Sequence, residues 1–288
     1  MTDTRAKSSG TLFVVATPIG NLDDLSPRAR KTLCGVEVVA AEDTRRTRGL
    51  LSSIGAQPTV IAYHEHNEDA RAGKLLERLR AGVDVALVSD AGTPLISDPG
   101  WQLVAEALAA GIEVRAIPGP SAVIAALAVS GLATDRYAFE GFLPRRAHLR
   151  AEYLRRLARE TRTLVFFESV HRLADTLSAL VEQLGADRRA TIARELTKLH
   201  EDVYAGSLAE LRAELGRSIP LLGEFVIVVA GLAEDIPVET DEIRRVFELL
   251  RQELPPDKAT ALTASITGAA RNTVYRLTRV ASAPDEAD

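Results

Sequence analysis

Short runs of apolar and β-branched residues alternate, along the first 120 residues, with longer stretches in which apolar residues recur at helical spacing. This alternation is typical of parallel α/β units. Predicted helices include residues 68–79 and residues 27–33, where Ser26 supplies an N-cap and Pro27 takes the first helical position. We therefore expect an N-terminal α/β domain over residues 11–117, with strands at residues 12–17, 36–40, 59–63, 84–89 and 112–117.

Pro118, Gly119 and Pro120 interrupt this pattern, because a proline lacks the backbone N–H donor and fixes φ. A second α/β domain, residues 118–231, is expected to begin there. Its predicted helices are residues 147–159 and 173–184, and its predicted strands are residues 163–167, 189–196, 202–204 and 224–229. The spacing combines parallel and hairpin-like connections, which predicts a mixed sheet.

An acidic, proline-containing stretch at residues 232–240 indicates a linker. Three short helices are predicted beyond it, at residues 241–254, 256–266 and 268–280. We expect them to form a small helical module, residues 240–281, of the helix-turn-helix type.

Composition narrows the class of protein. A chain of 288 residues with 46% hydrophobic and 26% charged residues suits about two ordinary globular domains. Because Cys34 is the only cysteine, an intrachain disulfide is excluded, and a reducing compartment is favoured. The sequence has no leader-like apolar segment and no apolar run long enough to span a membrane, so we expect a soluble, cytoplasmic protein. Its net charge of −5 provides no overall attraction for nucleic acid, which would have to bind at local basic patches.

Three loops rich in glycine and proline follow predicted strands, at residues 17–21, 89–100 and 118–122. Ligands of α/β folds bind at the carboxyl ends of strands, and residues 89–100 contain two glycines, two prolines and two aspartates. A G-x-G-x-x-G dinucleotide fingerprint is absent. Each loop is thus either a ligand site or a structural turn, and Ser121 either caps the next helix or binds a ligand.

Further polar motifs stand at residues 41–45, 141–144, 194–198 and 223–225. Together with the three loops, they resemble the tetrapyrrole-methylase superfamily over about residues 12–231. The chain has Gly92-Thr93-Pro94 where many porphyrinoid-methylating members have Gly-Asp-Pro, and it has Glu42-Asp43-Thr44-Arg45 after the second strand. These differences favour the branch of the superfamily that methylates the ribose 2′-hydroxyl of a cytidine in 16S rRNA. The C-terminal helices are similar to the helix-turn-helix extension that many of these enzymes carry.

The resemblance implies a homodimeric enzyme that binds S-adenosylmethionine in a cleft between its two α/β domains, largely through backbone groups. It implies 16S rRNA as the substrate, within the 30S subunit or as free RNA. Carried onto this sequence, the cofactor-binding residues are Gly20, Ala91, Gly92, Thr93, Pro94, Ile96, Ser121, Ala122, Phe167 and Leu196.

Methyl transfer from a sulfonium to a ribose hydroxyl requires in-line orientation and removal of a proton. The candidate bases are Asp43, Glu195 and Lys198, because each lies in a polar motif directly after an apolar run. The alternative for each is a structural ion pair. The reaction needs no metal, and His64 and His66 are expected to be surface or substrate contacts.

Residues 144–162 contain seven arginines and two glutamates, a local excess of positive charge in an acidic protein. We expect Arg145 and Arg146 there to contact RNA phosphates, unless the arginines merely form a solvated helix face. The other candidate RNA-binding residues are Arg45, Arg46, Arg276 and Arg279.

Two other functions remain open. A porphyrinoid methyltransferase of corrin or sirohaem synthesis is disfavoured by the arginine-rich patches and the C-terminal helices. A non-catalytic, cofactor-sensing module that binds nucleic acid is disfavoured because the polar motifs outside the helical module would then have no role.

Overall fold

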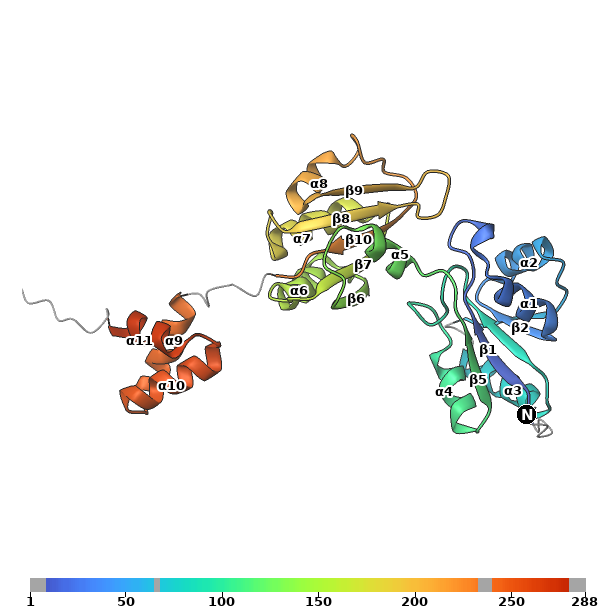
Figure 1. Ribbon diagram of the computed structural model, residues 1–288, viewed down its shortest axis with the longest axis horizontal. Helices are drawn as coiled ribbons and strands as arrows, with labels where there is room; N and C mark the ends of the chain where they lie inside the picture. Colours follow the sequence, from blue (N-terminus) through green and yellow to red (C-terminus); the bar gives the residue numbers. More distant parts are fainter. Residues whose placement is uncertain (1–8, 65–67, 233–239, 280–288) are drawn as a thin grey trace, which may run out of the picture. The chain divides into compact units, whose positions relative to one another are not determined.

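The computed structural model describes residues 9–64, 68–232 and 240–279. The chain divides into two compact units, residues 1–231 and residues 232–288 (Figure 1). The first unit contains two five-stranded sheets, and the second contains three helices in its described part. Among the described residues, the helices are all too short or too polar to cross a membrane.

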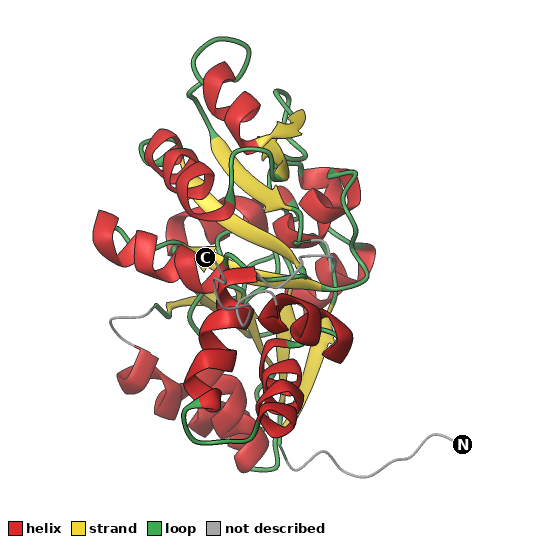
Figure 2. Cartoon of the chain, turned by 90° about the vertical axis from the view of Figure 1, so that its left-hand side faces the viewer, coloured by secondary structure: helices red, strands yellow, loops and turns green. Residues whose placement is uncertain are grey.

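The first sheet has the strand order β3-β2-β4-β1-β5, and its paired strands are parallel. Successive apolar residues of its strands point to opposite faces, so one face packs against α1 and α2 and the other against α3 and α4. Figure 2 shows strands, in yellow, with helices, in red, on both sides. The short helix η1 (Leu22–Asp24) follows β1. The strands are β1 (Thr11–Val15), β2 (Val38–Ala41), β3 (Thr59–Ala62), β4 (Val85–Val88) and β5 (Glu113–Ile117), and the helices are α1 (Pro27–Gly35), α2 (Thr44–Ser53), α3 (Glu68–Arg80) and α4 (Trp101–Ala109).

The second sheet has the order β6-β7-β10-β8-β9, in which β6 and β7 are parallel and the other pairs antiparallel. The prediction of a mixed sheet is confirmed. Helices α6, α7 and α8 cover one face, while α5 packs against the other. The strands are β6 (Tyr137–Phe142), β7 (Thr163–Ser169), β8 (Arg189–Arg194), β9 (Asp202–Ser207) and β10 (Glu224–Val229), and the helices are α5 (Ala122–Val129), α6 (Ala147–Leu157), α7 (Leu173–Leu184) and α8 (Leu208–Glu214).

Observed and predicted strands differ where a strand meets the loop at its carboxyl end. The first strand ends at Val15 rather than at residue 17, because Thr17 turns to form an isolated bridge with Gly92. The strand β8 ends at Arg194 rather than at residue 196, because Glu195 has a φ of 51° and leaves the extended region. These departures mark the loops that carry the candidate site.

The helical unit consists of α9 (Thr240–Arg251), α10 (Pro256–Thr267) and α11 (Arg271–Arg279). Its small core joins the three helices through Ile243, Phe247, Ala259 and Val274. The last helix begins at Arg271 rather than at residue 268, because Gly268 ends α10 in the left-handed conformation with a φ of 72°.

Candidate functional site

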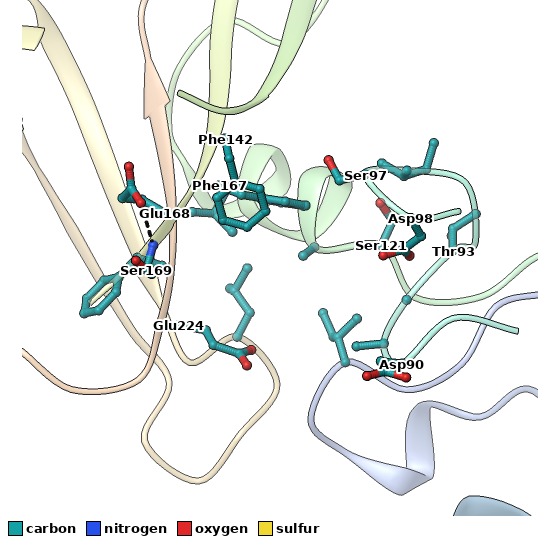
Figure 3. Close-up of a pocket in the computed structure, with 18 of the residues that line it drawn as sticks. Asp90, Thr93, Ser97, Asp98, Ser121, Phe142, Phe167, Glu168, Ser169 and Glu224 are labelled. Carbon is teal, nitrogen blue, oxygen red and sulfur yellow. Dashed lines mark hydrogen bonds between the residues drawn. The ribbon is translucent and has the colours of Figure 1, made fainter. Parts of the chain in front are cut away.

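A cavity of about 410 Å³ lies between the two sheets of the first unit (Figure 3). One wall comes from the loops that follow β1, β2, β4 and β5, and the other from β6, β7, β8, β10 and the loop after β8. This is the carboxyl edge of the first sheet, where α/β folds place their ligands, and the volume suits one small molecule. Labelled side chains of the first wall are Asp90, Thr93, Ser97, Asp98 and Ser121, and those of the second are Phe142, Phe167, Glu168, Ser169 and Glu224.

Backbone and side-chain hydrogen bonds fix the three glycine-rich loops of the first wall to one another. The backbone N–H of Thr17 donates to the carbonyl of Gly92 at 2.9 Å, and the N–H of Gly92 donates back at 3.1 Å. The hydroxyl of Thr93 donates to the carbonyl of Pro120 at 3.0 Å. Gly92 has a φ of 79°, and a Cβ there would lie 3.1 Å from the Cγ2 of Ile19, so a glycine suits this position. The loops form one pre-shaped backbone surface.

Two strained loops border the cavity. Among the described residues, the non-glycine positions with positive φ are Leu95 and Ser97 in the loop before α4, and Glu195 and Thr197 in the loop after β8. Such conformations cost on the order of 1–3 kcal/mol each and are retained mainly where the surrounding structure fixes them. Their gathering here supports a functional site.

The lining of the cavity is acidic. Among the described residues, it contains the carboxylates of Glu42, Asp90, Asp98, Glu168 and Glu224, and a single arginine, Arg46, which approaches Asp90 at 3.7 Å. Such a lining stabilises a cation and disfavours an anion.

Two of these carboxyl groups have raised pKa values. Burial, followed by the charge of Glu42, raises the pKa of Asp98 to about 6, although a hydrogen bond with Ser89 acts in the opposite direction. Burial and the charge of Asp90 also raise the pKa of Glu42. A carboxylate with a pKa near 6 is ionised at neutral pH and more basic than an ordinary aspartate.

Most of the predicted cofactor-binding residues lie together in this lining: Ala91, Gly92, Thr93, Ile96, Ser121, Ala122, Phe167 and Leu196. Gly20 and Pro94 lie outside it. Gly20 packs against the loop after β8, since a Cβ there would approach Lys198 and would lie 2.9 Å from the Oγ1 of Thr197. Pro94 is buried behind the surface of its loop. Within the described part of the chain, Ser121 occupies the N-cap position of α5 without a capping hydrogen bond from its side chain.

The three candidate bases lie in two different places, one at the start of α2 and the other in the loop after β8. Asp43 caps α2, and its carboxylate accepts hydrogen bonds from the backbone N–H groups of Arg45 at 2.7 Å and Arg46 at 3.3 Å. These bonds lower the pKa of Asp43. The side chain therefore acts as a helix cap beside the cavity, outside its lining.

Glu195 and Lys198, which lie outside the lining, form a cluster with Glu224, a lining residue of the other wall. The ammonium of Lys198 lies 2.7 Å from Glu195 and 3.1 Å from Glu224, and the backbone N–H of Glu224 donates to Glu195 at 2.9 Å. Burial disfavours the charged forms of both side chains, but these contacts outweigh its effect. The pKa of Glu195 is therefore lowered and that of Lys198 is raised. Both side chains are stabilised as ions, which makes them weak proton acceptors at neutral pH.

The candidate RNA-binding arginines are dispersed. Arg46 lies at the rim of the cavity, Arg45 is exposed beside it, and Arg145 and Arg146 are exposed between β6 and α6. Arg276 is exposed on α11 of the helical unit, and Arg279 ends that helix with its side chain outside the described residues. His66 also lies outside the described residues.

Part of the arginine-rich segment serves structure instead. Arg150 is buried, Arg156 pairs with Glu152, and Arg162 pairs with Glu160. The free positive charge of this segment is therefore smaller than its composition indicates.

Several lining residues were not singled out from the sequence. Asp90 and Asp98 stood in a loop that was predicted to bind a ligand, but nothing local distinguished their carboxylates from turn-forming aspartates. Phe142 ends β6, and Glu168 is the last residue but one of β7. The polar Glu168 directly after the apolar run of β7 is a signal that the sequence offers. Glu168 is buried and accepts a hydrogen bond from Thr176 at 2.6 Å.

Comparison with known proteins agrees with this geometry. Residues 11–212 match the family of Tetrapyrrole (Corrin/Porphyrin) Methylases, and residues 237–278 match the RsmI C-terminal HTH domain. The chain is 51% identical to Ribosomal RNA small subunit methyltransferase I of Xylella fastidiosa, over 92% of this chain and 98% of that protein. It is 49% identical to the protein of the same name from Pseudomonas aeruginosa, over 93% of this chain and 96% of the relative.

Solved structures show the same fold at lower identity. The uroporphyrin-III C-methyltransferase of Thermus thermophilus, complexed with S-adenosylhomocysteine, has a TM-score of 0.53 and 21% identity over 76% of this chain and 97% of that chain. Diphthine synthase has a TM-score of 0.58 and 16% identity over 77% and 90% of the two chains.

Proposed function

Since the chain belongs to the tetrapyrrole methylase family, we propose that it transfers the methyl group of S-adenosylmethionine to the ribose 2′-hydroxyl of a cytidine in 16S rRNA. The observation that carries this proposal is the similarity, over almost the full length, to methyltransferases of small-subunit ribosomal RNA. The cavity and its lining supply the chemistry.

The residues of the cavity fit the cofactor. The backbone around Gly92 is open to close approach, Ile19 and Phe167 offer apolar surface for an adenine ring, and the carboxylates suit a sulfonium. When bound, S-adenosylmethionine supplies an electrophilic methyl group. Ala91, Gly92, Thr93, Ile96, Ser121, Ala122, Phe167 and Leu196 would hold it, with Gly20 and Pro94 supporting the loops from outside the lining.

Asp98 is our proposed proton acceptor. It lines the cavity and has a pKa of about 6, whereas Asp43 is committed to capping α2 and Glu195 is paired with Lys198. As the ribose oxygen bonds to the methyl carbon and the bond between that carbon and the sulfonium sulfur breaks, the carboxylate of Asp98 would accept the hydroxyl proton and later release it to water.

We also propose that the enzyme acts in the cytoplasm on the 30S subunit as a homodimer. Large apolar side chains exposed on the first unit, including Trp101, Leu199 and Leu222, support a surface for self-association. The exposed arginines beside the cavity and on α11 support contact with RNA phosphates.

Mass spectrometry of ribonucleosides tests the function. 30S subunits from a strain that lacks the gene are incubated with the purified protein and S-adenosylmethionine. The 16S rRNA is digested to ribonucleosides before and after this incubation. The expected product is 2′-O-methylcytidine within a linkage that resists alkali, because alkaline cleavage needs a free 2′-hydroxyl. A base-methylated nucleoside, or transfer only to a porphyrinoid, would contradict the proposal. Free 16S rRNA, assayed in parallel, identifies the substrate form.

A further inference from the structure

The strand β6 contains a bulge beside the cavity. Its pairing with β7 passes from Phe139 opposite Val165 to Gly141 opposite Phe166, so that Glu140 is an extra residue. Gly141 has a φ of 63°, and a Cβ there would lie 3.4 Å from the Oγ of Ser97 on the opposite wall. Bulges commonly redirect a side chain next to a functional site.

This bulge decides where Phe142 points. Residues three positions apart face opposite sides of a regular strand, but the extra residue returns Phe142 to the face occupied by Phe139. Both rings contact Phe167 edge to face, with centroids 4.8 Å apart for Phe139 and 5.7 Å apart for Phe142. The bulge therefore adds an aromatic ring to the cavity that a regular strand would direct away.

The backbone that follows Phe142 is firmly held. Leu143 is buried, and the guanidinium of Arg172 donates to the carbonyls of Leu143 at 2.6 Å and Pro144 at 3.4 Å. Arg172 in turn lies 3.5 Å from Glu168, a lining carboxylate. Phe142 is thus positioned in advance of any ligand.

Phe142 lines the cavity (Figure 3). The residue is 56% exposed, so we place it at the opening. A cavity of about 410 Å³ holds one small molecule, so a macromolecular methyl acceptor has to approach from this open side. Exposed aromatic rings bind unstacked bases of RNA, and the exposed Arg145 and Arg146 follow directly along the chain.

We propose that Phe142 is the stacking surface for the base of the methyl-accepting nucleotide, and that Arg145 and Arg146 hold the neighbouring phosphates. This assignment rests on the proposed function and adds a substrate subsite to it. The base is unstacked from the RNA and lies against the ring, which leaves its ribose at the opening of the cavity toward Asp98.

Equilibrium binding to 30S subunits, in the presence of S-adenosylhomocysteine, tests the stacking role. Phe142→Ala and Phe142→Leu should weaken RNA binding on the order of tenfold to hundredfold, while Phe142→Tyr and Phe142→Trp keep most of it. The matched control is Tyr137→Ala, at the other end of the same strand, because Tyr137 is 41% exposed and lies outside the cavity lining. This control should bind as the wild type does.

A second experiment removes the nucleobase of the target nucleotide instead of the ring of Phe142. Subunits whose 16S rRNA carries an abasic ribose at the target should bind wild-type protein as weakly as intact subunits bind Phe142→Ala, and this variant should not distinguish the two RNAs. If the losses of affinity caused by Phe142→Ala and by the abasic ribose add together, the assignment is overturned. It is also overturned if Phe142→Leu binds RNA as tightly as the wild type does. A loss confined to cofactor affinity would assign the ring to the adenine instead. Methylation by the wild type, measured separately, reports on the proposed function itself.

Discussion

Thr17 and Gly92 exchange a pair of backbone hydrogen bonds, of 2.9 and 3.1 Å, between loops that are 75 residues apart in the sequence. The pair joins the loop after β1 to the loop after β4, and it leaves the Cα of Gly92 facing Ile19 inside the cavity. Cofactor affinity should therefore be sensitive to any side chain at this glycine.

We predict that Gly92→Val blocks cofactor binding in a protein that remains folded. The side chain would intrude toward Ile19, and a left-handed φ costs a non-glycine residue about 1–2 kcal/mol. Calorimetric titration with S-adenosylmethionine measures the affinity. Gly82→Val is the matched control, because Gly82 has a φ of 90° and no described atom would lie within 4 Å of its Cβ. Equal affinities for the two variants would refute the placement of the cofactor.

Asp98→Asn should abolish most of the methyl transfer, on the order of 10²- to 10⁴-fold in kcat, with a smaller effect on cofactor affinity. For the wild type, kcat should rise with pH through about 6, as Asp98 loses its proton and becomes able to accept another. A rate profile of the wild type that is flat from pH 5 to 8 would exclude Asp98 as the base.

The same substitution should stabilise the protein at neutral pH. The pKa of Asp98 is raised on folding from 3.8 to about 6, so the folded state binds the proton more tightly, and stability falls as pH rises through this window. After allowance for solvent screening, the gain in Asp98→Asn at pH 7 is on the order of 1 kcal/mol. Thermal denaturation at pH 4 and pH 7 measures it, and the difference between variant and wild type should appear only at the higher pH.

Arg145→Glu with Arg146→Glu should lower RNA affinity and flatten its dependence on salt, because each lost phosphate contact reduces the number of released counterions. Cofactor affinity should change little, since both residues lie outside the cavity lining. Arg276→Glu with Arg279→Glu tests in the same way whether the helical unit contacts RNA phosphates. Arg212→Glu with Arg217→Glu, two exposed arginines outside the lining, controls for net charge. An unchanged salt slope for both test pairs would place the RNA elsewhere.

Lys198→Met should destabilise the first unit by about 1–3 kcal/mol, because it leaves Glu195 partly buried without its partner. The pKa of Glu195 is lowered, so its contribution to stability is present above the pKa of the unfolded chain and is lost as acid protonates it. Arg156→Met, which breaks an exposed pair with Glu152, should cost less than about 0.5 kcal/mol. Urea denaturation at pH 7 and pH 3 measures the free energy of unfolding of both variants and the wild type. If Lys198→Met loses a similar amount of stability at both pH values, the ion-pair explanation is contradicted.

The strands of the first sheet and the loops of the cavity were predictable, because both leave a local signal of apolar runs followed by glycine and proline. The strand β6 was not, since Glu140 and Gly141 interrupt its alternation at the bulge. The helix α5 is apolar around its whole circumference and so shows no helical period.

Roles within the site were harder to predict than its location. The basicity of Asp98 arises from burial and from Glu42, which lies far away in the sequence. The commitment of Asp43 to a helix cap likewise depends on where α2 begins. Both depend on the packed structure, which a single sequence does not display.

The acidic lining of the cavity also has a consequence for turnover. A sulfonium carries a positive charge, and the thioether that remains after transfer is neutral, so the attraction of Glu42, Asp90 and Asp98 is lost in the same step that completes the reaction. We therefore expect the lining to favour release of the spent cofactor, because the charge that attracted the fresh one is no longer present.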